Sequence, residues 1–175
     1  QAPVIARGGP ALPRPGAPGY AYDLARQFGL KVVDPRPALV PLTLGGEDVL
    51  FRDISGVSAN VEAHSGKTAF REAALFTHRG LSGPAILQIS SYWHPGEPVH
   101  INLTHGLDLR DTLRAQRQTE GRRQLSTELS RHLPGRLVEH LTTEWAGCFD
   151  LTERLADQSD TALDALLGQL SDWQL

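Results

Sequence analysis

One stretch decides the fold of this chain: Leu75-Phe-Thr-His-Arg-Gly-Leu-Ser-Gly-Pro-Ala-Ile-Leu-Gln-Ile-Ser-Ser-Tyr-Trp93. Its first four residues have the pattern of the end of a strand. Two glycines, Ser82 and Pro84 follow and indicate the start of a helix, with Ser82 as the expected N-cap and Pro84 suited to the first turn. The helix is predicted to continue to about Trp93. The stretch therefore predicts a strand, a glycine turn and a helix in direct succession.

This succession has two interpretations. Backbone N–H groups and the positive end of a helix could converge on an anion or a cofactor. An ordinary strand-to-helix connection has the same residues, and local sequence favours it because such caps are common. His78, at the predicted strand end near Ser82, is the candidate catalytic residue. The run Gly80-Leu-Ser-Gly83 is only a truncated form of the serine hydrolase motif, so we do not expect nucleophilic catalysis.

Upstream of this stretch the apolar residues recur with a period of two, which is typical of strands. Val57 to His64 alternates most clearly, and His64-Ser-Gly-Lys67 is a plausible hairpin turn. Short strands are predicted over residues 38–44, 49–51, 57–64, 68–78 and 99–103. The proline in the first of them suggests an edge or a bulge. Together they predict a small antiparallel, β-barrel-like sheet.

Downstream of residue 108 the apolar period is helical. Helices are predicted over residues 109–118, 122–133, 136–145 and 161–170. Their apolar faces supply ten core candidates: Leu113, Leu125, Leu129, Leu133, Leu137, Leu141, Leu163, Leu166, Leu167 and Leu170. The predicted fold class is therefore α+β, with the sheet followed by a helical subdomain. We expect three regions: a strand–loop–helix segment (1–34), the β-barrel-like domain (35–107) and the helical subdomain (108–175).

The first region has a predicted strand at residues 4–6, a proline-rich loop, a helix over residues 20–28 that stops at Gly29, and a short strand at 31–33. Gly8 and Gly9 open the loop between the first strand and the helix, where a glycine-rich backbone could hold a phosphate group. The spacing matches neither common phosphate-binding motif.

Composition and charge exclude several classes of protein. The chain has 175 residues and a net charge of −3, so no global basic field predicts nucleic-acid binding. Cys148 is the single cysteine, which excludes an intrachain disulfide and favours a reducing, cytoplasmic setting. No apolar run reaches the roughly 18 residues of a membrane helix, so no membrane partner is expected. Methionine is absent and the chain starts with an apolar, strand-like run, which favours a fragment of a longer protein.

Two groups of side chains suggest ligands. The seven histidines lack the spacings of metal ligands along the chain, and we predict no metal site. Arg110, Arg114 and Arg117 repeat at helical spacing and could follow RNA phosphates. Nearby acidic residues and the absence of an interleaved aromatic platform favour an ordinary charged surface, so nucleic acid is a possible but not a favoured partner.

Several motifs, in order, resemble the bacterial FAD-dependent oxidoreductases of the BaiN/RdsA-like group, also called the aminoacetone oxidase family. The motifs are Ile5–Gly9, Pro13, Gly16–Tyr20, Pro37-Ala-Leu-Val-Pro-Leu42, Leu75-Phe-Thr-His-Arg-Gly-Leu-Ser-Gly-Pro84 and Ile101-Asn-Leu103. The resemblance covers essentially the whole chain.

The resemblance implies that this chain is the inserted, substrate-side middle of a flavoprotein, and that the remainder of the flavin-binding domain is its partner. The family's pyrophosphate loop lies in an N-terminal segment outside this chain, so we expect the chain to bind FAD weakly or not at all by itself. Gly8 and Gly9 are the implied cofactor contacts. Arg7, Ala11 and Pro18 depart from the family, which has hydroxyl side chains at these positions close to the flavin.

Two functions follow from these observations. The first is a fragment of an FAD-dependent oxidoreductase, with NAD(P)H as a candidate electron donor, that is inactive alone and acts on an unknown small-molecule substrate when complete. The second is a non-catalytic binding module that contacts RNA or a protein through its arginine-bearing helices.

Overall fold

The computed structural model describes residues 19–44 and 51–175. The chain divides into two units, residues 1–37 and 38–175. The predicted strand at residues 4–6, Gly8, Gly9 and most of the proline-rich loop lie outside the described residues, as do two residues of the strand predicted at 49–51. The predicted boundaries at residues 34/35 and 107/108 stay predictions.

The described part of the first unit contains one helix, α1 (Tyr20–Gln27). It ends as predicted, because Gly29 has a positive φ of 72° and its N–H bonds the carbonyl of Arg26. Within the described part of the chain α1 buries none of its residues, and Phe28, which follows it, is 73% exposed. The strand predicted at residues 31–33 is wrong, since this segment has no regular structure.

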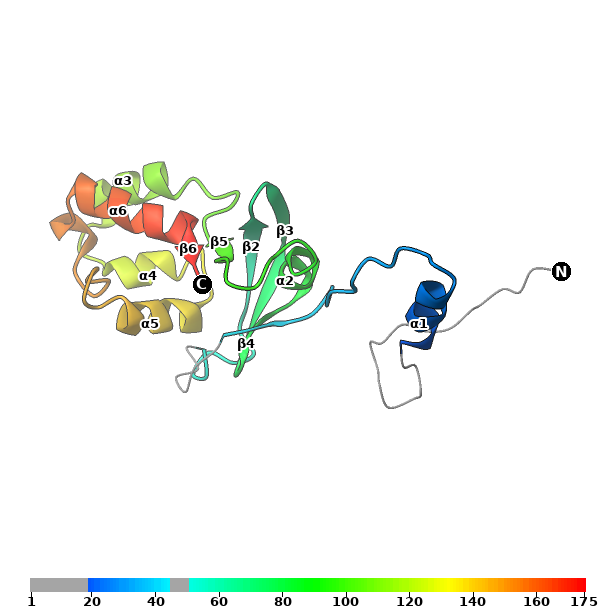
Figure 1. Ribbon diagram of the computed structural model, residues 1–175. Coiled ribbons are helices and arrows are strands. Elements are labelled where there is room, and N and C mark those ends of the chain that lie inside the picture. Colours follow the sequence, from blue (N-terminus) through cyan, green and yellow to red (C-terminus); the bar gives the residue numbers. More distant parts are fainter. Residues whose placement is uncertain (1–18, 45–50) are drawn as a thin grey trace. The chain divides into compact units, whose positions relative to one another are not determined.

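The second unit is built on a six-stranded sheet in which every neighbouring pair is antiparallel (Figure 1). In order along the chain the strands are β1 (Leu42–Thr43), β2 (Ser58–Ser65), β3 (Thr68–Thr77), β4 (Gly80–Ser82), β5 (His100–Asn102) and β6 (Trp173–Gln174). Their order across the sheet is β1-β4-β3-β2-β5-β6. The sheet and the helices that follow it confirm the predicted α+β class.

The hairpin of β2 and β3 is the centre of the sheet. Its register runs from Ser58 opposite Leu75 to Ser65 opposite Thr68, with Gly66 at a positive φ of 56° in the turn. The predicted alternation is confirmed, because Ala59, Val61 and Ala63 are buried while the residues between them face outward. This alternation gives the sheet one apolar face and one polar face.

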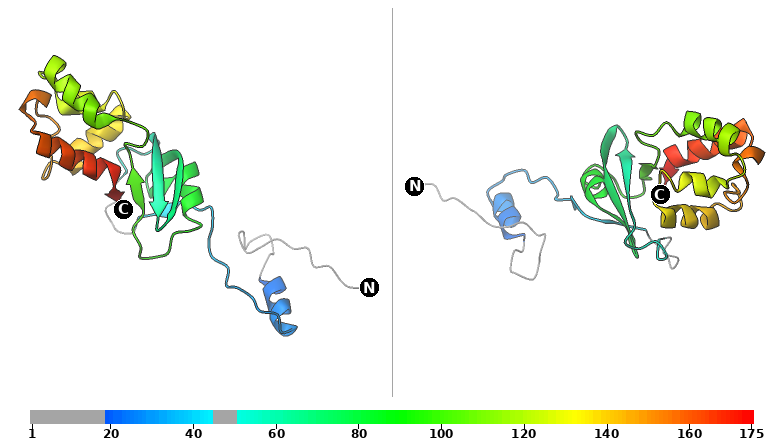
Figure 2. Two further views of the ribbon diagram at one scale, coloured as in Figure 1. Left: turned by 90° about the horizontal axis from the view of Figure 1, so that it is seen from above. Right: turned by 180° about the vertical axis from the view of Figure 1, so that it is seen from behind.

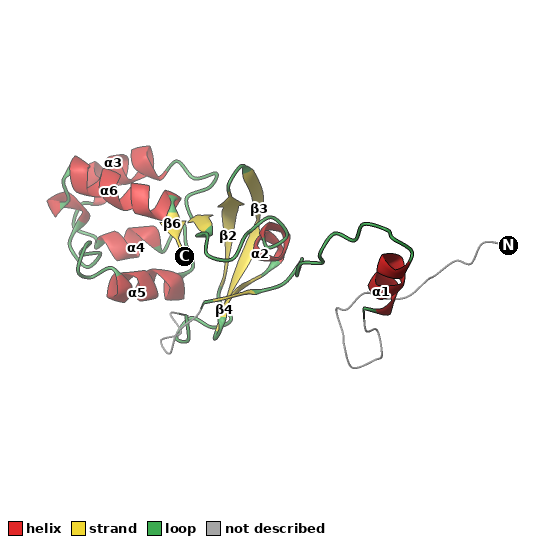
Figure 3. Ribbon diagram, viewed as in Figure 1, coloured by secondary structure: helices red, strands yellow, loops and turns green. Residues whose placement is uncertain are grey.

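Helices cover the unit on two sides. They are α2 (Pro84–Ile89), α3 (Leu109–Glu120), α4 (Leu125–Leu129), α5 (Gly135–Glu144) and α6 (Asp160–Ser171), with a short 3-10 helix, η1 (Leu155–Asp157). Figure 3 shows α2 against the strands and the other helices gathered beyond β5 and β6, and the two views of Figure 2 show the same arrangement. Helix α2 packs on β2 and β3, and α6 packs on β5. None of the described helices combines the length and the apolarity that crossing a lipid bilayer requires.

One continuous core joins the sheet to the helices. Trp173 of β6 lies at its centre, with ring centroids 5.6 Å from Phe51, 6.2 Å from Phe76 and 5.7 Å from Trp145. Nine of the ten predicted core leucines are buried, and Leu167 packs against the core from a partly exposed position. The last residues of the chain therefore return to the sheet, and β6 corrects the expectation that everything after residue 108 is helical.

The stretch that decides the fold differs in detail from its prediction. Ser82 lies in β4 and does not cap the helix; Gly83 holds the cap position, and no side chain caps α2. The helix ends at Ile89 and not near Trp93, because the N–H groups of Ser91 and Tyr92 bond the carbonyls three residues back, of Gln88 and Ile89, in a tighter turn. Downstream, the helix predicted from residue 122 begins only at Leu125, because residues 121–123 form a turn and the extended Gln124 bridges to Arg154.

The two glycines of this stretch are required by close backbone approach. A Cβ on Gly80 would lie 2.3 Å from the carbonyl oxygen of Leu42 in β1, and one on Gly83 would lie 2.8 Å from that of Ala73 in β3. Both also have positive φ, at 140° and 90°. The glycines therefore let β1, β4 and β3 pack together, which is a structural requirement and not evidence of an anion site.

Candidate functional site

The polar face of the sheet carries a row of ionisable side chains along β2 and β5. Glu62 and His64 alternate outward on β2, opposite Asn102 and His100 of β5. Ile101, between the two polar residues of β5, points into the core. Because side chains on one face of paired strands lie next to each other, the register alone brings these four residues together.

Asp172 completes a cluster with the two histidines of this row. His100 Nδ1 lies 2.6 Å from Asp172 Oδ1, and His64 Nε2 lies 3.7 Å from the same oxygen. The two imidazole rings stack with centroids 4.5 Å apart. The hydrogen bond from His100, followed by one from Gln174, holds the pKa of Asp172 below its ordinary value although partial burial acts to raise it. His64, His100 and Asp172 are far apart along the chain, so no local motif contains them.

Glu62 forms a second polar contact on the same face. It accepts a hydrogen bond from Arg71 of β3, and His105 Nδ1 lies 3.7 Å from its Oε2. The bond from Arg71 is the main reason why the pKa of Glu62 lies below its ordinary value. Glu62 is therefore an ionised acceptor beside the two strands.

A groove opens beside this row, between β2 and the turn that leads into α5. Its polar lining is Ser58, Asn60, His105 and His132, and its apolar lining includes Leu103, Leu107, Leu133 and Pro134. Asn60 is exposed, and the buried His132 Nε2 has no hydrogen-bond partner within the described residues. The groove thus offers amide and imidazole groups between apolar walls, which suits a small polar ring.

A second histidine–carboxylate pair has a structural role. His140 of α5 is 6% exposed, and its Nδ1 lies 2.8 Å from Asp53 Oδ2. Burial raises the pKa of Asp53, but the hydrogen bond and charge of His140 outweigh it, so the pKa lies below its ordinary value. Arg136 also donates to the backbone carbonyl of Asp53. The side chains of His140 and Arg136 therefore hold the turn before β2 in place. The Nε2 of His140 is buried, so a substrate cannot reach it.

The arginines of α3 are paired with α6 and do not form a free basic surface. Arg110 lies 3.1 Å from Asp164, and Arg117 lies 2.6 Å from Asp160. Arg114 lies between, within 3.8 Å of both aspartates. The geometry agrees with the favoured interpretation of these arginines as a charged surface balanced by carboxylates.

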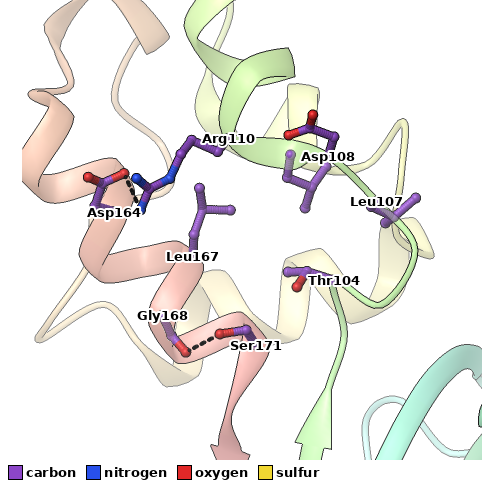
Figure 4. Close-up of a pocket in the computed structure, with 9 residues that line it drawn as sticks. Thr104, Leu107, Asp108, Arg110, Asp164, Leu167, Gly168 and Ser171 are labelled. Atoms are coloured by element: carbon purple, nitrogen blue, oxygen red, sulfur yellow. Dashed lines mark hydrogen bonds and ion pairs between the residues drawn. The ribbon is translucent and has the colours of Figure 1, made fainter.

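The pocket between α3 and α6 has its polar groups already engaged (Figure 4). Arg110 points to Asp164, and the Ser171 hydroxyl donates to the Gly168 carbonyl at 2.9 Å. Asp108 accepts from the N–H of Asp111 as the N-cap of α3. With these groups satisfied, the pocket gives little means of selecting a polar ligand.

The family model described as "HI0933-like protein barrel and H2TH domain" matches residues 36–175, which include the whole sheet and the helices α2–α6. The chain belongs to this HI0933-like family. The match supports, at the level of the family, the resemblance drawn from the sequence motifs.

Two curated relatives of this HI0933-like chain carry the name Ribosomal RNA dihydrouridine synthase. The protein of Escherichia coli K12 is 43% identical over 175 residues, which covers 98% of this chain and 43% of the relative. The protein of Haemophilus influenzae Rd is 41% identical over 138 residues, which covers 78% of this chain and 34% of the relative. The chain thus spans between a third and a half of the length of either relative.

The predicted site residues have separate places in the HI0933-like fold. His78 is exposed in the turn between β3 and β4, where Thr77 pairs with Gly80. Ser82 pairs with Leu75 further along the ladder, and within the described residues no hydrogen bond joins it to His78. Gly8 and Gly9 lie outside the described residues. The catalytic and cofactor-binding roles of these three residues stay predictions.

The sequence pattern did not predict that His64, His100 and Asp172 lie together on the HI0933-like sheet. The outward phase of Glu62 and His64 on β2 was visible in the alternation. The pairing with β5 was not visible, and β6, which brings Asp172 close, was not predicted. Predicting that residues 57–64 pair with residues 99–103, and in which register, would have placed His64 opposite His100.

Proposed function

We propose that this chain is the RNA-holding, substrate-side region of a longer FAD-dependent reductase that forms dihydrouridine in ribosomal RNA. The observation that carries the proposal is the 43% identity, over 98% of this chain, with the E. coli Ribosomal RNA dihydrouridine synthase. Ribosomal RNA as the substrate agrees with the cytoplasmic setting expected from the single cysteine.

The reductant belongs to another part of the complete protein. Dihydrouridine has two more hydrogens than uridine across the C5–C6 bond, so its formation needs a two-electron donor, for which the resemblance implies FAD with NAD(P)H as a candidate source. The residues described do not fit a flavin: all strand pairs in residues 19–44 and 51–175 are antiparallel, whereas a dinucleotide fold uses parallel strands and a glycine-rich turn. We therefore assign flavin binding to the remainder of the protein and keep His78 as the candidate catalytic residue.

The groove beside β2 is the proposed place where the chain holds a uridine. The uracil ring offers two carbonyl acceptors and one N–H donor, and the amide of Asn60 presents both a donor and an acceptor. His105 and His132 add ring nitrogens, while Leu103 and Leu107 give the base an apolar contact. Proteins that read RNA by sequence bind unstacked bases in this way, with hydrogen bonds to the base edge.

The arginine-bearing helices give little support to the alternative function, a non-catalytic module that binds RNA or a protein. Three arginines of α3 face two aspartates of α6, so most of their charge is neutralised within the protein. Arg122 lies in the turn after α3, and Arg154 lies in the extended segment that bridges to Gln124; neither has a carboxylate partner among the described residues. They are the arginines of this region that remain for RNA phosphates.

Fluorescence anisotropy with a labelled, uridine-containing single strand of ribosomal RNA tests the groove. Asn60→Asp removes the amide donor and adds one negative charge, and we expect it to weaken binding about tenfold, as for the loss of a good base-edge contact. Gln27→Glu makes the same chemical change at an exposed position of α1 and should weaken binding less than about twofold. Equal losses in the two variants, or no binding by the unchanged chain, would remove the groove from the proposal.

A further inference from the structure

We propose that His64, His100 and Asp172 form a binding site for a divalent transition-metal ion of the zinc class, on the polar face of the sheet. The ligand atoms are His64 Nε2, His100 Nδ1 and Asp172 Oδ1, and all three lie within 4.8 Å of one another. Two imidazoles and a carboxylate are donors that Zn²⁺, Co²⁺ and Ni²⁺ accept together. The site is independent of the proposed uridine groove.

The distances are close to those of a loaded site. Donors around a tetrahedral ion with bonds of roughly 2.0–2.1 Å are separated by about 3.3 Å. The two separations involving Asp172 Oδ1 are 2.6 Å and 3.7 Å, one below and one above that value. The donor atoms are therefore near the separations that an ion requires, and side-chain rotation is needed to point all three at it.

The backbone holds the three ligands in position. His64 and His100 are direct partners in the β2–β5 ladder. Asp172 comes immediately before β6, where the buried Trp173 pairs with Ile101 and fixes the end of the chain. An ion bound here would join β2, β5 and the segment before β6, which are contributed by distant parts of the sequence.

The second oxygen of Asp172 has its own partner. Gln174 Nε2 donates to Asp172 Oδ2 at 3.2 Å, which leaves Oδ1 turned to the histidines. Such outer hydrogen bonds orient the ligands of protein metal sites. The side chains of His64, His100 and Asp172 are 33%, 23% and 48% exposed, so water can reach the ion and occupy a fourth position.

Loading the ion changes the histidine pair in a recognisable way. The two rings are stacked at an interplanar angle of 16°, whereas imidazole lone pairs lie in the ring plane and must converge on the ion. At least one ring therefore turns on binding, and the Nδ1 of His100 gives up the hydrogen bond to Asp172.

The test uses the full 175-residue chain after treatment with a chelator. Co²⁺ is titrated while its visible absorption is recorded, and Zn²⁺ is then added as a competitor. We expect one saturable site per chain and a higher midpoint of thermal unfolding with Zn²⁺, because the ion binds the folded state. His64→Gln, His100→Gln and Asp172→Asn should each weaken binding at least about tenfold.

His94→Gln is the matched control, because His94 is an exposed histidine in the turn before β5 and lies outside the cluster. It should bind the ion as the unchanged chain does. The proposal is overturned if the unchanged chain shows no saturable binding, if the three ligand variants bind normally, or if His94→Gln loses as much affinity as they do. Far-UV circular dichroism checks folding, and Asp172→Asn, which conserves size, decides the question if a histidine variant does not fold.

Discussion

Gly80 and Gly83, at the start of β4 and directly after it, and the histidine cluster of β2, β5 and Asp172 belong to the same sheet region but act in opposite ways. Gly80 and Gly83 act through the absence of a side chain, since a Cβ would meet backbone atoms of β1 and β3. In the cluster, the backbone is regular and three ionisable side chains meet. The most recognisable stretch of this sequence therefore serves the fold, whereas the residues suited to bind ligands are brought together only by strand pairing.

The largest expected effect is the loss of stability on replacing Gly80 or Gly83. Gly80→Ala or Gly83→Ala combines a backbone clash with an unfavourable φ, and each should lower the free energy of unfolding by about 3 kcal/mol. For a chain of this size that corresponds to a thermal midpoint lower by roughly 10 °C. Differential scanning calorimetry of both variants measures the effect.

Gly168→Ala is the matched control for this measurement. Gly168 lies within α6, and a Cβ there has nothing within 4 Å. Alanine is the better helix former, so this variant should be as stable as the unchanged chain or more stable by up to about 1 kcal/mol. If Gly80→Ala is as stable as Gly168→Ala, the structural role given to Gly80 is wrong.

A smaller effect is expected in the histidine cluster. The folded pKa of Asp172 is below its unfolded value of about 3.9, so its contribution to stability is fully present above that pH and is lost as the pH falls through the folded pKa. Asp172→Asn should cost at most about 1 kcal/mol at neutral pH, because Asp172 and its histidine partners are partly exposed. The difference from the unchanged chain should shrink below about pH 4.

Urea unfolding between about pH 3 and pH 7 measures this dependence, with metal chelated throughout. Asp157→Asn changes an exposed aspartate of η1 and should show no comparable difference. A constant difference between Asp172→Asn and the unchanged chain over the whole pH range would contradict the role given to the carboxylate.

The sequence predicted the parts of the fold that depend on local pattern. The alternation of residues 57–64 and the leucine spacing of the helices correctly located β2, β3, α3, α5 and α6. Asp108 acts as a cap where an aspartate precedes an apolar helical run. These features are set by neighbours within a few residues, and the sequence shows such neighbours directly.

What the sequence did not predict depends on distant partners. Ser82 has the residue type of a cap, but pairing with Leu75 keeps it in β4. Trp173 and Gln174 form a strand only because β5 offers a free edge and the core accepts the indole. The histidine cluster needs both the β2–β5 register and the position of β6. Neither of these can be read from the spacing of residues along the chain.

We propose that this chain holds ribosomal RNA for a flavin reductase, and a chimaera tests this proposal most directly. In E. coli cells that lack their Ribosomal RNA dihydrouridine synthase, the matching 43% of that protein is replaced by this chain. The flavin content of the purified chimaera and the dihydrouridine in ribosomal RNA are measured by absorbance and mass spectrometry. We predict normal flavin content and restored dihydrouridine. A folded, flavin-loaded chimaera that leaves ribosomal RNA without dihydrouridine would contradict the claim.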